Sequence, residues 1–209
     1  VAALLPTLPV LLSRPRGDGR QIMLLPGLFN DDRSMWPLRQ YLCALGYDAL
    51  PWSLGRNNGQ PEIDAGRVVE QIRKVRRKGE AITLIGWSLG GVIAREVARR
   101  EPKNVREVLT LGTPVEGGPK YTAGARQFAL RQNIDLDELE RRIHDINAQG
   151  IRQPLTIVYS RSDAIVSWRA AIDRYNPHAR HKHIVSSHLG LGFNPLVWRH
   201  VANTLSATR

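Results

Sequence analysis

Ser88 lies in the stretch "AITLIGWSLGGVIAREVARR", residues 81–100, with Gly86 two positions before it and Gly90 and Gly91 shortly after it. A serine on a sharp turn between a strand and a helix projects its hydroxyl above the sheet, where side chains two residues away would collide. Glycine removes that collision. The pattern therefore predicts either a serine nucleophile or only a small residue in a tight turn, and the motif alone does not separate the two.

A serine nucleophile needs a general base, normally histidine, and a carboxylate that orients the base. In a parallel sheet these groups must follow later strands, because the site lies at the carboxyl edge. Asp163 comes three residues after the apolar run "LTIVYS", and His188 comes in the loop after "HKHIVS". The order Ser, Asp, His is the one expected of such a sheet. Ser88, Asp163 and His188 are therefore the predicted catalytic triad.

The other acids and histidines are weaker candidates for these roles. Asp173 is a rival acid, but it follows Asp163 by ten residues and is expected in a helix. The remaining histidines are expected on helices, on the last strand or just before it: His144, His178, His181, His183 and His200.

The tetrahedral intermediate of acyl transfer also needs a pair of N–H donors for its oxyanion. The first is expected to be the N–H of Leu89, directly after the nucleophile. The second is expected in the turn "LLPGLFND", where Gly27 lets the backbone approach closely. Leu28 is the predicted second donor, with Phe29 as the next choice.

The same turn has a plainer interpretation, in which Asp31 or Asp32 simply caps the helix that follows. For a catalytic site, we expect two aromatic side chains to contact the substrate. Phe29 lies within this turn, and Trp87 directly precedes the serine.

Six apolar runs of strand length alternate with helical patterns, which predicts a parallel sheet covered by helices on both faces. Strands are expected at 21–26, 47–52, 81–87, 105–112, 155–160 and 181–186. Helices are expected at 35–46, 62–79, 89–100 and 195–207. A length of 209 residues fits one domain, 1–209.

An insertion of about forty residues, 115–154, separates the fourth and fifth expected strands, which is more than such a connection needs. Asp135 and Glu138 have the spacing of a capping box and predict a helix start. The helix then carries one apolar stripe: Leu136, Leu139, Ile143 and Ile146. Two interpretations stay open. The stripe packs on the sheet, or the insertion forms a small cap or lid over a binding site.

Composition and charge limit the function classes. The chain is 42% hydrophobic and 23% charged, which is typical of a globular protein and excludes a disordered one. Its formal charge of +11 favours anionic partners such as nucleic acid, anionic lipid or acidic substrates. The only dense cluster, residues 72–79, is expected to be a solvated helix face, and no nucleic-acid motif is present. We therefore expect at most weak attraction to anionic surfaces and no specific nucleic-acid binding.

Cys43 is the only cysteine, which excludes an intramolecular disulfide and an all-cysteine metal site. We expect this side chain to be buried in a helix. One thiol excludes neither an oxidising nor a reducing compartment, and a cytoplasmic location is slightly favoured over secretion. The opening "VAALLPTLPVLL" carries Pro6 and Pro9 and is too short and too broken for a transmembrane helix. It lacks a basic leader, so a removed signal would leave no trace.

Five stretches resemble, in the same order, the small lipase and esterase branch of the alpha/beta-hydrolase superfamily: "PGLFNDDRSMWPLRQYL", "LIGWSLGG", "LTLGTPVEGG", "YSRSDAIVSW" and "SSHLGLGFNPLV". The resemblance covers nearly the whole chain from Gln21. It implies a three-layer α/β fold with a six-stranded, mostly parallel sheet in the order 2-1-3-4-5-6. It also implies Ser88, Asp163 and His188 as the triad, and hydrolysis of small-molecule or lipid esters through an acyl-enzyme without cofactor or metal.

One departure from the family concerns Pro26 and Gly27, where many members have His-Gly; how the oxyanion loop is held therefore stays open. "GTPVEGG" resembles lipases and deacylases that act on lipid-like substrates, although Thr113 and Pro114 are expected only to shape the exit from the fourth strand. The same triad would serve a thioesterase, an amidase or an acyltransferase. The fold would also serve a non-catalytic protein that binds lipid or a polymer.

Overall fold

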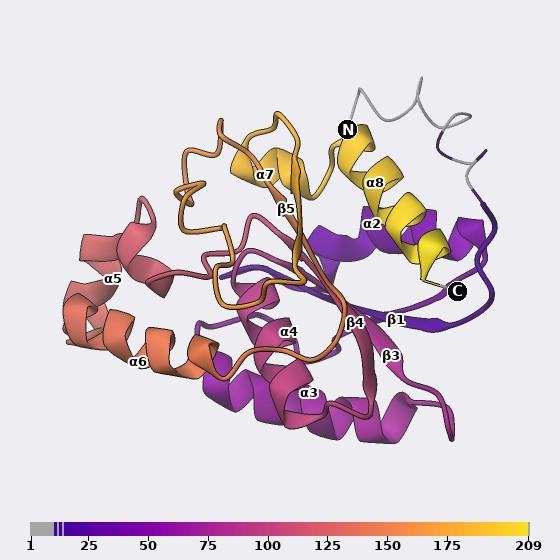
Figure 1. The fold of residues 1–209 in the computed structure, drawn as a ribbon, viewed down its shortest axis with the longest axis horizontal. Helices are drawn as coiled ribbons and strands as arrows, with labels where there is room; N and C mark the ends of the chain where they lie inside the picture. Colours follow the sequence, from indigo (N-terminus) through magenta and orange to yellow (C-terminus); the bar gives the residue numbers. More distant parts are fainter. Residues whose placement is uncertain (1–10, 12, 14, 209) are drawn as a thin grey trace.

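A six-stranded sheet forms the centre of the protein, which the computed structural model describes at residues 11, 13 and 15–208 (Figure 1). All neighbouring strands in it are parallel, and their order is β2-β1-β3-β4-β5-β6. The strands are β1 (Gln21–Leu25), β2 (Asp48–Pro51), β3 (Ile82–Trp87), β4 (Val105–Leu111), β5 (Leu155–Tyr159) and β6 (Arg180–His183). The predicted strand order is confirmed.

Alternate side chains of the strands pack into two separate cores, because successive residues of a strand point to opposite faces. In β1, Ile22 and Leu24 enter one core, while Met23 and Leu25 enter the other. Both faces of the sheet are therefore apolar, as the nearly continuous apolar runs of the sequence predict.

Helices cover both faces and complete three layers (Figure 1). One face packs against α2 (Asp32–Leu45) and α8 (Pro195–Ala207), and the other packs against α3 (Pro61–Val75) and α4 (Leu89–Arg100). Pro195 occupies the first turn of α8, where its missing N–H costs no hydrogen bond. The α4 helix begins directly after Ser88, so the fold places that residue between β3 and a helix N-terminus.

The insertion forms η1 (Gly118–Tyr121), α5 (Ala125–Gln132) and α6 (Leu136–Ala148), which lie together at one end of the molecule in Figure 1. Asp135 caps α6 by accepting hydrogen bonds from the N–H groups of Asp137 and Glu138, as predicted. Lys120 forms ion pairs with Asp137 and Glu140. These charges fasten α6 to η1. One further short helix, α7 (His188–Leu191), precedes α8, so His188 begins a helical turn and does not lie in a loop as expected.

Three predictions about α2 and α3 differ from the structure. The helix expected at 35–46 already begins at Asp32, because the Asp31 side chain caps it there. The helix expected at 62–79 ends at Val75, because Arg76 turns to an extended conformation and the Arg77 N–H donates to the side chain of Gln21. Cys43 lies in α2 but is exposed. It falls on the outer side of that helix, whose buried face is formed by Met35, Leu38, Tyr41, Leu42 and Leu45.

The last strand also differs from its expected range, 181–186. It begins at Arg180 and ends at His183, because the Ser186 N–H donates to the side chain of Ser160 instead of continuing the ladder. All four residues of this edge strand are exposed.

The apolar opening, residues 1–12, for which the sequence excludes a membrane-spanning helix, lies outside the described residues apart from Leu11. Leu11 is buried, and its carbonyl accepts a hydrogen bond from the Tyr41 hydroxyl. Within the part of the chain that the structure describes, no helix is long and apolar enough to cross a membrane.

Candidate active site

Ser88 stands on a strained turn between β3 and α4. Its φ is 53° and its ψ is −122°, a backbone conformation that non-glycine residues rarely adopt. A Cβ on Gly86 would lie 2.4 Å from the Gly90 carbonyl carbon, and one on Gly90 would lie 2.2 Å from the Leu25 oxygen. Both glycines are therefore required by the turn, which is the steric reason inferred from the sequence.

The turn is held by β4 and by the residues that follow it. The Ser88 N–H donates to Leu111 O at 2.8 Å, and the Thr113 hydroxyl donates to Ser88 O at 3.0 Å. A Cβ on Gly91 would lie 1.9 Å from Thr113 Oγ1, so α4 can approach this hydroxyl only through a glycine. Thr113 thus holds the strained turn in addition to lying at the exit from β4, a contact that the sequence does not reveal.

His188 and Asp163 are directly bonded. His188 Nδ1 lies 2.7 Å from Asp163 Oδ2, and both side chains are buried. The other carboxylate oxygen, Oδ1, accepts hydrogen bonds from the N–H groups of Ile165 and Val166. Because a carboxylate only accepts, Nδ1 carries the proton of this bond, and in the neutral ring Nε2 is then an acceptor.

Trp87 and Gly112 pack closely around the bonded pair of His188 and Asp163. The Trp87 indole N–H donates to His188 O at 3.2 Å, and the two rings lie 5.9 Å apart between centroids. Gly112 has a φ of +57°, and a Cβ there would lie 3.2 Å from Asp163 Oδ2 and 3.3 Å from His188 Nδ1. Gly112 was not singled out from the sequence, because a glycine at the end of a strand resembles any turn residue.

A cavity of about 670 Å³ brings most of the predicted residues together. Its wall includes Ser88 and His188, while Asp163 lies behind the histidine. Other parts of the wall are apolar and come from the insertion: Phe128, Ile134, Leu139, Ile143 and Ile146. Three of the four residues in the predicted stripe of α6 therefore face this cavity.

The oxyanion-loop candidates lie beside the serine. Leu28 and Leu89 both line the cavity, and a Cβ on Gly27 would lie 3.2 Å from Ser88 Cβ. As the first residue of α4, Leu89 has no acceptor within the helix for its N–H. The Phe29 N–H donates to Asn57 O at 2.8 Å. Among the described residues none accepts from the Leu28 N–H, so Leu28 is better placed than Phe29 to be the second donor.

Asn57 holds this loop and was missed in the sequence. It is fully buried, and its side-chain amide donates to Pro26 O at 2.9 Å. Its own N–H donates to Asn30 O, so three of its hydrogen bonds reach the segment 26–30. In a stretch such as "GRNNGQ" an asparagine is typical of any turn, and nothing local marks this one as buried.

Of the two aromatic residues expected to contact the substrate, only one lines the cavity. Trp87 lines the cavity, although only 2% of it is exposed and it mainly backs His188. Phe29 is 54% exposed, lies under the Arg56 guanidinium and is not part of the cavity wall. Asp31 caps α2, as one interpretation of this turn expects. Asp32 instead accepts hydrogen bonds from the loop after β2, and burial raises its pKa.

The rival acid, Asp173, lies in irregular structure, so its expected place in a helix is wrong. Its Oδ1 accepts from the N–H groups of Tyr175 and Asn176, which closes a turn instead. Its Oδ2 lies 2.6 Å from Arg95 Nη1 in a buried ion pair. Burial alone raises the pKa of Asp173, but Arg95 and the other hydrogen-bond donors hold it below its usual value. The Asp173 N–H donates to His181.

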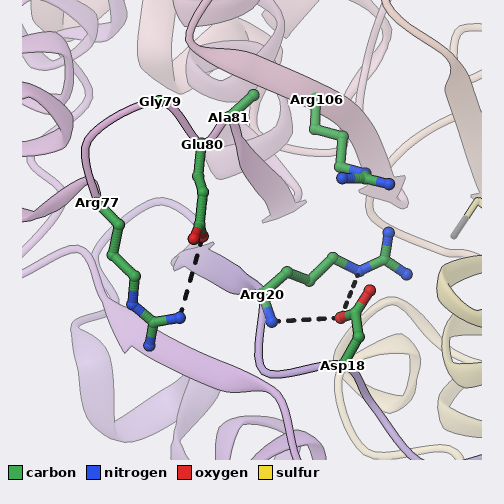
Figure 2. A pocket seen from close by; sticks show the side chains of 7 residues that line it. All are labelled: Asp18, Arg20, Arg77, Gly79, Glu80, Ala81 and Arg106. Carbon is green, nitrogen blue, oxygen red and sulfur yellow. Dashed lines mark hydrogen bonds and ion pairs between the residues drawn. The ribbon is translucent and has the colours of Figure 1, made fainter.

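A second, smaller hollow of about 330 Å³ lies at the opposite edge of the sheet, before β1, β3 and β4 (Figure 2). Four of its charged residues form two ion pairs, Asp18 with Arg20 and Arg77 with Glu80, and Arg106 also lines the wall. It holds neither a serine nor a histidine in its wall. Across the described residues, no group of three or more His, Cys, Asp or Glu side chains could hold a metal ion.

The model of one protein family, described as the alpha/beta hydrolase family, matches residues 22–207. The chain belongs to this family. A pimeloyl-[acyl-carrier protein] methyl ester esterase from Pseudoalteromonas atlantica is similar to this alpha/beta hydrolase, with 31% identity over 130 residues. The match covers 59% of this chain and 47% of that esterase, so the matched segment spans about half the length of the relative.

Solved structures share the fold of this alpha/beta hydrolase. One, from work on the metagenome-derived lipolytic enzymes LipS and LipT, has a TM-score of 0.70 at 13% identity and covers 93% of this chain and 96% of its own. The carboxylesterase CesB of Bacillus subtilis has a TM-score of 0.62 at 13% identity, covering 92% and 85%. At such identities the likeness concerns the fold alone.

Proposed function

We propose that the protein is a serine hydrolase of carboxylic esters, with Ser88 as nucleophile, His188 as general base and Asp163 as the acid that orients the base. One observation carries the proposal. His188 is bonded to Asp163 through Nδ1 at 2.7 Å and lines the same cavity as Ser88, whose backbone is strained. Strain of this kind persists where the surrounding structure imposes it, and it gathers at functional sites.

In the proposed mechanism, His188 Nε2 takes the proton of the Ser88 hydroxyl as its oxygen attacks the ester carbonyl. The backbone N–H groups of Leu28 and Leu89 bind the resulting oxyanion. His188 returns the proton to the departing alcohol, which leaves an acyl group on Ser88. Water then attacks this acyl-enzyme by the same route and releases the acid. Asp163 holds the imidazole in the tautomer that makes Nε2 basic.

The cavity supports a proposal for the substrate class. Its largely apolar wall suits an acyl chain, and the family relatives include enzymes named as esterases. We propose that the insertion 115–154 serves as a cap, because Leu139, Ile143 and Ile146 face the cavity and are absent from both cores of the sheet. The matched relatives are named for a methyl ester of pimeloyl-[acyl-carrier protein]; for this chain we propose only the same type of bond.

The test replaces Ser88 by alanine and measures hydrolysis of a short-chain nitrophenyl ester. Loss of the nucleophile is expected to lower kcat by about a thousandfold or more without unfolding the protein. Ser53→Ala is a matched control, since Ser53 also has a positive φ, 59°, but is exposed and outside the cavity wall. Normal turnover by the Ser88→Ala protein would show that the nucleophile is wrongly assigned.

A fluorophosphonate separates the remaining alternatives. Labelling of Ser88 supports acyl transfer, and offering thioesters, amides and alcohols to the enzyme then distinguishes an esterase from a thioesterase, an amidase or an acyltransferase. Folded protein that resists labelling would instead indicate a non-catalytic binding protein on the same fold.

A further inference from the structure

The segment 161–200 is strongly cationic at its surface. It contains six Lys and Arg residues but only two acids, Asp163 and Asp173. Both acids are buried and bonded, one to His188 and one to Arg95. Within the described chain, only Arg174 of the six cations has a carboxylate within 4 Å, on Glu116. The exposed charge of this segment is therefore left mostly without a counterion from the protein itself.

Two of these cations lie against one aromatic ring. The guanidinium carbons of Arg161 and Arg169 lie 5.2 Å and 4.7 Å from the ring centroid of Trp168. The ring of Tyr159 stacks on Trp168 at 6.3 Å and holds it in place. Cation–π attraction offsets part of the repulsion between the two guanidinium groups, but both are exposed and neither has an acidic partner in the described structure. An external anion would complete this cluster.

Exposed aliphatic side chains lie on the loop after β5, on the segment after β6 and on α7. Ile165 and Leu189 both line the wall of the cavity that holds Ser88, yet they are 45% and 64% exposed. Val185 is 69% exposed, and its segment is joined to the loop after β5 by the bond from Ser186 N–H to Ser160 Oγ. This loop and α7 lie at the same end of the molecule in Figure 1. We call the set the mouth patch: Arg161, Ile165, Trp168, Arg169, Val185 and Leu189.

We infer that the mouth patch docks on the surface of an anionic lipid layer. The guanidinium groups bind headgroup phosphates, and the aliphatic side chains enter the boundary between headgroups and acyl chains. Trp168 suits that boundary, where one side of an aromatic ring is apolar and the other polar. A nucleic acid would satisfy the charges but leave the aliphatic side chains in water. Docking itself does not depend on the proposed function; only the delivery of lipid esters to Ser88 does.

The test measures binding of the wild-type protein to vesicles of diether phosphatidylglycerol and of diether phosphatidylcholine, which contain no ester to hydrolyse. Binding is expected on the anionic vesicles only and should weaken as salt is added. Arg161→Gln with Arg169→Gln should weaken it about thirtyfold, from about 1 kcal/mol for each cation at such a surface. Val185→Ser should weaken it about fivefold through lost apolar burial.

The matched control is Lys78→Gln with Lys103→Gln, which removes the same charge from exposed loops at the opposite edge of the sheet. It should leave binding within about twofold. Equal weakening by both double variants would mean that net charge alone attracts the protein, and the proposal would fall. It would also fall if the protein bound neither vesicle, or if these side chains instead mediated a dimer detected by sedimentation. Activity on a water-soluble ester, measured in parallel, reports separately on the proposed function.

Discussion

The side chain of Asn57 donates a hydrogen bond to the carbonyl of Pro26, although the two residues are 31 positions apart. Together with the backbone bonds to Phe29 and Asn30, this contact fixes the turn that follows β1. The family resemblance left open how a Pro-Gly loop is held here. A buried amide from the loop after β2 is the answer, so we regard Asn57 as a positioning residue for the proposed oxyanion donor Leu28.

Replacing Asn57 by alanine is expected to lower kcat about a hundredfold, because loss of one well-placed oxyanion donor has an effect of this order. The KM for a short nitrophenyl ester should change much less, since the donor acts mainly on the transition state. Asn58→Ala is the control: Asn58 is adjacent, exposed and outside the cavity wall. Equal kcat values for the two variants would remove Asn57 from the mechanism.

Gly112 offers a second test, directed at the bond between His188 and Asp163. In Gly112→Ala the new methyl group would lie 2.6 Å from Leu191 Cδ1 and crowd both members of the pair, and the φ of +57° disfavours alanine. Displacement of the proposed base, His188, by about 1 Å is expected to lower kcat about a hundredfold. Kinetics with a nitrophenyl ester would measure this, provided circular dichroism shows an intact fold.

Gly66→Ala is the matched control for Gly112→Ala. The position lies inside α3, and its nearest neighbour, Arg100 Nη1, would be 3.7 Å from the added Cβ. Alanine should stabilise the helix by about 1 kcal/mol and leave kcat unchanged. Unaltered kinetics in Gly112→Ala as well would mean that this close packing does not constrain the pair.

Much of this arrangement follows from the sequence because the relevant signals are local. Apolar runs and helical periodicity predict the parallel sheet, and the family resemblance implies its strand order. Such a sheet carries Ser88 and His188 to the same edge. Asp163 and His188 closely follow expected strands, and short connections in such a sheet place them at the carboxyl edge. Their positions therefore predict them as partners of Ser88.

What the sequence did not predict depends on contacts between distant segments. Thr113 bonds to the backbone carbonyl of Ser88, and Asn57 bonds to that of Pro26. Because every residue has a backbone carbonyl, no partner side chain marks either contact in the sequence. The predicted burial of Cys43 is wrong because a helix turns by about 100° per residue. One step along α2 therefore separates the buried Leu42 from the exposed Cys43. The predicted helix at Asp173 is wrong because its own carboxylate closes a turn there, and the sequence does not reveal this contact.

Asp173 supports a prediction about stability. In Asp173→Asn the buried Arg95 loses its countercharge, which is expected to lower the free energy of unfolding by about 3–5 kcal/mol. The folded-state pKa of Asp173 lies below its usual value of 3.8, so its contribution is complete above that pH and is lost as the pH falls through the folded pKa. Urea unfolding at pH 7 and at progressively lower pH should show the gap between wild type and variant narrowing.

Arg95→Met combined with Asp173→Asn removes both charges and should recover part of that loss. If Asp173→Asn alone were as stable as wild type at pH 7, the ion pair would contribute nothing to the free energy of unfolding. A gap that widened on acidification would contradict the assigned direction of the pKa shift.

The proposed cap makes a prediction about acyl-chain length. Ile143 lies on α6 and faces the cavity, so Ile143→Trp should fill part of its volume. Turnover of nitrophenyl esters with long chains is expected to fall at least about tenfold relative to the acetate, because each excluded methylene has an effect of this order. Arg141→Trp places the same side chain on an exposed position of α6 outside the cavity wall. If both variants kept the wild-type profile from acetate to decanoate, the acyl chain would not lie under α6, and the insertion would not act as a cap.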